Sequence, residues 1–106
     1  MAWIYLVTAG VLEVVWAFAM KQSAGFTRLW PTAIMAVSMA GSVGFLALAM
    51  RTLPLGTAYT IWTGIGAVGA FAAGVVVLGE QVSVMRIVAA ALIVSGIVLM
   101  KLATSD

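Results

Sequence analysis

A single acidic residue, Glu13, lies inside a long apolar run near the start of the chain. In a helix that begins at Ala2, it is roughly 16 Å along the axis, near the middle of a bilayer core about 30 Å thick. A charged carboxylate at that depth costs about 2.5–3.5 kcal/mol. Acids kept inside spans usually bind protons or ions. The plainer alternative is a protonated Glu that only joins two helices by a hydrogen bond.

The inventory of titrating groups makes Glu13 stand out further. The chain has no histidine and no cysteine, and its other two acids, Glu80 and Asp106, lie outside the apolar runs. We therefore expect no metal site and no cofactor, and we do not expect an enzyme. A lone acid at low dielectric is reluctant to stay both charged and empty. It is expected to hold either a proton or a cation.

The neighbours of Glu13 at helical spacing suggest a pocket. Gly10, Glu13 and Ala17 share one helix face, and the small residues are expected to leave open space around the carboxylate. Trp16 lies three positions on, on an adjoining part of that surface. Its aromatic face could attract a cation, although contact with lipid or plain packing is an even alternative.

Other spans offer aromatic and hydroxyl groups. Tyr59 and Trp62 are three residues apart, and Ser38 and Ser42 are four apart near the middle of another apolar run. Together with an acid they could form a site for a small organic cation, because hydroxyl groups can hold a carboxylate in position. For the two serines, and more strongly for Ser38, ordinary hydrogen bonding between helices is the alternative.

The elements that must position these residues are membrane spans. The chain is 65% hydrophobic and only 8% charged, against about 45–50% and about 25% for soluble domains. A domain of this size could not bury so much apolar surface. We expect an all-α integral membrane protein, one four-helix domain over residues 1–106. The helices are predicted at 2–20, 29–50, 53–78 and 84–100.

The short links make successive helices antiparallel and divide the basic residues almost evenly. One side of the membrane would carry three Lys/Arg residues and the other two. These are Lys21, Arg28 and Arg86 against Arg51 and Lys101. So small a bias favours insertion in both orientations, or else an orientation set by something other than these charges.

Small residues in the last two spans suggest where helices bend or meet. Gly64 and Gly66 are candidate hinges, although close helix packing explains such glycines equally well. Ala89 and Gly96 are seven apart on one stripe of the last span and are candidate dimer contacts. Because four short helices can hardly enclose a guarded pathway, a transporter of this size needs at least two copies. Oppositely inserted copies would supply the symmetry of an inverted repeat.

The whole chain resembles the small multidrug resistance transporters. Three stretches carry the resemblance: residues 13–17 (EVVWA), 25–31 (GFTRLWP) and 58–66 (AYTIWTGIG). Within that family it is most similar to the guanidinium exporters. The marker is Trp16, where drug exporters carry a small residue, and Ser42 and Lys101 also fit.

The resemblance implies an antiparallel, dual-topology homodimer in the bacterial inner membrane. It implies exchange of protons for guanidinium by alternating access, with Glu13 of both copies binding either one. Trp16 and Ser42 would orient Glu13 by hydrogen bonds, while Tyr59 and Trp62 would line the pocket. The last helix would hold the dimer together. The alternatives are a quaternary-ammonium or multidrug exporter of the same family, a small membrane subunit that transports nothing, and a passive channel.

Overall fold

The computed structural model describes residues 1–104, and that part of the chain forms four α-helices. They are α1 (Ala2–Gln22), α2 (Leu29–Ala49), α3 (Leu55–Val76) and α4 (Val84–Ala103). Each has 20 to 22 residues and is apolar enough to cross a membrane. The all-α multi-pass membrane fold is thus confirmed. Asp106, the acid that the sequence places beyond the last span, lies outside the described residues.

The ends of α3 differ from the predicted range 53–78, and turn chemistry explains why. Pro54 is the N-cap, with an extended backbone (φ −60°, ψ 150°), so the helix begins at Leu55. The residue before a proline avoids the helical region, which leaves Leu53 outside the helix. At the other end the chain turns at Gly79, whose φ of 68° lies in the left-handed region.

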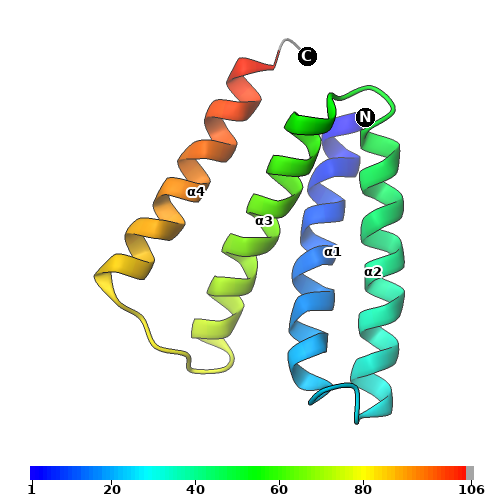
Figure 1. The fold of residues 1–106 in the computed structure, drawn as a ribbon, viewed down its shortest axis with the longest axis vertical. Coiled ribbons are helices and arrows are strands. Elements are labelled where there is room, and N and C mark those ends of the chain that lie inside the picture. Colours follow the sequence, from blue (N-terminus) through cyan, green and yellow to red (C-terminus); the bar gives the residue numbers. More distant parts are fainter. Residues whose placement is uncertain (105–106) are drawn as a thin grey trace.

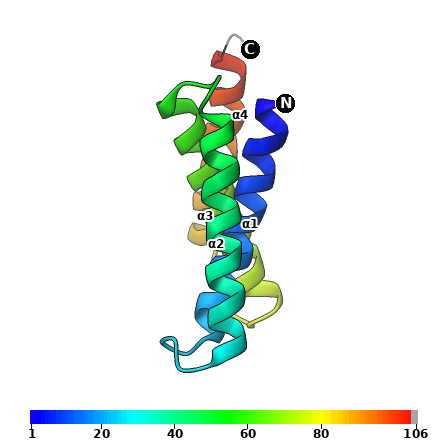
Figure 2. The same ribbon diagram turned by 90° about the vertical axis from the view of Figure 1, so that its right-hand side faces the viewer.

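The helices lie side by side in the order α4, α3, α1, α2 (Figure 1). The molecule measures 43 × 34 × 16 Å, and the turned view shows how thin it is (Figure 2). α1 packs against both α2 and α3, whereas α2 meets α3 over a small area. The start of α1 and the end of α4 lie at the same end of the molecule (Figure 1). A single chain is therefore close to one layer of helices.

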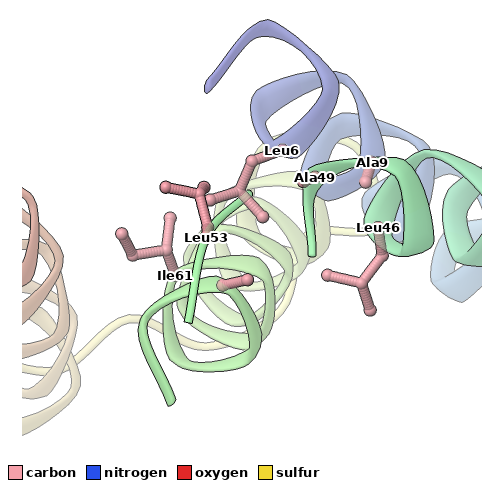
Figure 3. Packing of buried hydrophobic residues seen from close by; sticks show 7 residues of the cluster. Leu6, Ala9, Leu46, Ala49, Leu53 and Ile61 are labelled. Carbon is pink, nitrogen blue, oxygen red and sulfur yellow. The ribbon is translucent and has the colours of Figure 1, made fainter. Parts of the chain in front are cut away.

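The buried core occupies the end of this layer that holds the amino terminus. Leu6 and Ala9 of α1 are fully buried there, facing Leu46 and Ala49 of α2 and Ile61 of α3 (Figure 3). Alanines at 9 and 49 let α1 and α2 approach closely. This packing fixes the register of α1 against its neighbours, and Glu13 follows about one turn beyond Ala9.

Helix α4 is different, because none of its residues is buried. Its backbone contacts only α3, and it leans away from the other helices (Figure 1). Near its end, the Lys101 side chain reaches α1, where its Nζ lies 4.2 Å from the centroid of the Trp3 ring. Ala89 and Gly96 are both exposed. Most of this apolar helix is left for lipid or for another protein to cover.

Candidate functional site

The Glu13 carboxyl group lies against the backbone of α3 at Gly66. Its Oε1 atom is buried and has no hydrogen-bond partner. A Cβ added at Gly66 would overlap the carboxyl group and come within 2.8 Å of Glu13 Cγ. Glycine at this position therefore makes the space that the carboxylate occupies. An acceptor that is buried without a donor is costly, so this oxygen is poised for a proton or a hydrogen-bonding cation.

Gly10 brings the two helices together on the same face. A Cβ there would lie 2.6 Å from Cγ2 of Ile65, and one turn past Gly10 the side chain of Val14 packs against Gly69 of α3. The structure corrects one expectation: the room beside Gly10 is filled by Ile65 rather than open. Gly10 allows α1 and α3 to approach closely, and that approach presses Glu13 against Gly66.

Ser42 joins three helices through two hydrogen bonds. Its Oγ donates to the backbone carbonyl of Ala9, at 2.6 Å, and accepts from Nε1 of Trp62, at 2.9 Å. Ser42 is fully buried. Its hydroxyl proton is thus committed to α1, so in the single chain Ser42 does not donate to Glu13. It fixes the Trp62 indole instead. Ser38 donates only to Ile34 of its own helix, at 2.5 Å.

The aromatic residues of the site differ in their contacts, because the Trp62 indole is held by a hydrogen bond and the Trp16 indole is not. The Tyr59 and Trp62 rings lie 5.5 Å apart between centroids, tilted by 49°, and Tyr59 is half exposed. Tyr59 also borders a groove between α3 and α4 that includes Gly96. Trp16 differs from Trp62, because its Nε1 donor is buried and has no partner. The site therefore contains an unused acceptor on Glu13 and an unused donor on Trp16, both on α1.

Comparisons with known proteins show the family of this chain. The profile of the Small Multidrug Resistance protein family matches residues 1–93. The chain belongs to this family. Relatives named "Guanidinium exporter" include proteins of Yersinia pseudotuberculosis (57% identical), Escherichia coli K12 (55%) and Citrobacter freundii (54%). Each alignment covers 98% of this chain and 99–100% of the relative. The resemblance drawn from the sequence motifs is thereby confirmed.

In this small multidrug resistance protein, the two hinge candidates have distinct contacts. α3 continues as a helix through both glycines. Gly66 accommodates Glu13, whereas a Cβ at Gly64 would lie 2.9 Å from Cδ1 of Ile97 on α4. The sequence motifs did not reveal these contacts, nor the role of the Ala9 carbonyl. The sequence indicates Gly66 as a candidate hinge, but not as the residue that contacts Glu13.

Proposed function

We propose that this protein exports guanidinium and small guanidinyl cations from bacteria across the inner membrane, in exchange for protons. The observation that carries the proposal is the buried, unpartnered Glu13 oxygen against Gly66 in the middle of a span. The names of the relatives support the choice of substrate. A carboxylate can accept two parallel hydrogen bonds from a planar cation with several N–H donors, and guanidinium is a small cation of that kind.

Proton transport and cation transport are coupled because both ions bind to the same group, Glu13, and only one can bind at a time. A protonated Glu13 carries no charge to attract the cation. A bound cation, in turn, stabilises the charged carboxylate and so opposes its protonation. A carboxylate that is charged and empty is disfavoured at low dielectric. The site therefore changes its access from one side of the membrane to the other only when it is protonated or loaded with the cation. This alternation exchanges one species for the other.

The surrounding residues have separate tasks in this proposal. The Ser42 bond to Trp62 keeps the indole and the neighbouring Tyr59 ring at the wall of the pocket, where their faces attract a cation. The buried Nε1 of Trp16 has no partner in the single chain. It is the donor that would orient the Glu13 carboxylate when the pocket closes. Gly64 would let α3 bend as access alternates.

A second copy completes the site. One layer of helices only 16 Å thick cannot enclose a substrate on all sides. The exposed face of α4, including Ala89 and Gly96, is available to hold a partner. In the proposed antiparallel homodimer, two layers face each other and bring both copies of Glu13 to a shared pocket. The nearly even distribution of basic residues permits this opposite insertion.

Transport by the purified protein in proteoliposomes tests the proposal. With an imposed pH gradient, we expect guanidinium and singly substituted guanidinium ions to drive proton flux. Bulky multi-ring cations should not, because Trp16 occupies volume beside Glu13. Equal transport of both classes would place the protein among multidrug exporters. Guanidinium flux without proton movement would indicate a channel, and absence of any flux a non-transporting subunit.

Dual topology is a second expected result. A reporter fused to the carboxyl terminus should be found on both sides of the membrane, since Lys/Arg residues divide three against two. One or two lysines added to either side should convert the population to a single orientation. The measurement is reporter activity on each side in cells. A single orientation for the unmodified chain would contradict the homodimer and require a partner of opposite topology.

A further inference from the structure

A cavity with one carboxylate and one ammonium group lies on the Glu13 face of α1, toward the loop that joins α3 to α4. It has a volume of about 220 Å³ and is lined by Ala17, Phe18 and Lys21 of α1, by Ala70, Ala73 and Gly74 of α3, and by Leu78 and Glu80 of the loop. At about 30 Å³ per water molecule, this space holds several waters or a guanidinium ion of four heavy atoms.

The cavity continues the line of residues that begins at Glu13. Ala17 and Lys21 follow Glu13 at intervals of four on one face of α1. On the opposing helix, Ala70 and Gly74 follow Gly66 at the same interval. The cavity therefore begins about one helical turn, or about 5 Å, from Glu13 and extends toward the end of the helices.

The backbone holds Glu80 over this cavity. The chain reverses at Gly79 in a left-handed conformation (φ 68°), and the Glu80 N–H donates to the Gly74 carbonyl at 3.0 Å. The Glu80 carboxylate then lies against Gly74, where an added Cβ would overlap it and lie 2.8 Å from its Cδ atom. Glycines thus position both acids: Gly66 receives Glu13, and Gly74 with Gly79 places Glu80.

The role that we assign to Glu80 follows from the two charged side chains that line the cavity. Lys21 and Glu80 both line the cavity and are both exposed. A cation that approaches Glu13 along this face passes the Lys21 ammonium, which repels it. Glu80 cancels that charge and offers an acceptor oxygen at the entrance. Without Glu80, the cavity would carry the positive charge of Lys21 alone, and a cleft of one sign repels ions of that sign.

We infer that this cavity is the entry vestibule for the cationic substrate, and that Glu80 attracts the cation while offsetting Lys21. The inference rests on the proposed export of guanidinium. It assigns Glu80 to substrate capture and leaves proton coupling to Glu13. Loss of Glu80 should therefore raise the KM for guanidinium and leave the maximal rate and the proton coupling unchanged.

The test is guanidinium transport by the full chain in proteoliposomes at about 0.01 M and about 1 M ionic strength, where the Debye length is about 30 Å and about 3 Å. At low salt, Glu80→Gln should raise KM by about three- to tenfold, and high salt should remove most of the difference. Lys21→Gln should lower KM, and the double variant should return it close to the wild-type value. Asp106→Asn, which removes the same charge from the carboxyl terminus, should change little.

These measurements distinguish failure of the vestibule inference from failure of the proposed export function. A KM that is unchanged in Glu80→Gln while the wild type transports guanidinium would overturn the inference and leave the proposed function intact. The same holds if Glu80→Gln lowers the maximal rate instead, or if Lys21→Gln in the double variant fails to restore KM, because both results indicate a structural role. Absence of guanidinium transport by the wild type would overturn the proposed function itself.

Discussion

Glu13→Gln should abolish guanidinium binding and proton-coupled guanidinium transport, at least a hundredfold below wild type in flux. Glutamine keeps the size of the side chain but cannot be charged or take up a proton at neutral pH. Of the two acids among residues 1–104, Glu13 and Glu80, only Glu13 lies within an apolar span. The buried Oε1 atom of Glu13 has no hydrogen-bond partner, so no contacting group would take over the binding of the proton or the cation. Flux in proteoliposomes and binding by calorimetry measure the two losses separately.

Two controls separate chemistry from folding in this experiment. The Glu13→Gln protein should elute from a size-exclusion column at the wild-type position, because Oε1 of Glu13 makes no hydrogen bond that would hold helices together. Glu13→Asp should retain transport with a displaced pH dependence, since the acid remains but is one methylene shorter. Full transport by Glu13→Gln would show that another group carries the proton.

Gly66→Ala should reduce guanidinium affinity by about tenfold or more and leave the fold intact. A methyl group at this position overlaps the Glu13 carboxyl group. The clash falls on the end of a flexible side chain, so the carboxylate moves and the helices stay in place. Overpacking typically costs about 1–3 kcal/mol, and here we expect most of that cost to appear as misplacement of Glu13. Calorimetric binding and thermal unfolding of the purified variant measure the two effects.

The matched control is Gly56→Ala, because Gly56 lies on the same helix and has open space around its Cβ position. It should bind and transport as the wild type does. The experiment also separates two roles for Gly66. If Gly66 serves only as a hinge, Gly66→Ala should bind guanidinium normally and fail only in transport. Normal binding would therefore contradict the contact role that the structure gives this glycine.

Most of the fold could be predicted because the spans are separated by charges. Long apolar runs with few charged residues have only one stable arrangement in a bilayer, which is the helix. The ends of the spans are harder to predict, since hydrophobicity alone extends the third span from 53 to 78. Pro54 and Gly79 set its real limits through backbone conformation.

The sequence predicts which residue types could form a site, but not the contacts that they make. Glu13, Trp62 and Ser42 could be selected because acids, indoles and hydroxyls are unusual near the middle of a span. Their partners depend on how α1 crosses its neighbours. The acceptor of the Ser42 proton is the Ala9 carbonyl, and no side-chain pattern marks a backbone acceptor. The filling of the Gly10 space by Ile65 also depends on the register between α1 and α3.

The measurement that tests the central claim most directly is guanidinium affinity as a function of pH, by calorimetry or tryptophan fluorescence. A guanidinium group stays charged throughout, so only the protein changes. Protonation of Glu13 removes the carboxylate that binds the cation. Affinity should therefore rise by about tenfold per pH unit on the acid side and level off on the alkaline side, with the two copies titrating as a coupled pair. Affinity that is independent of pH, or undiminished in Glu13→Gln, would contradict competition at this residue.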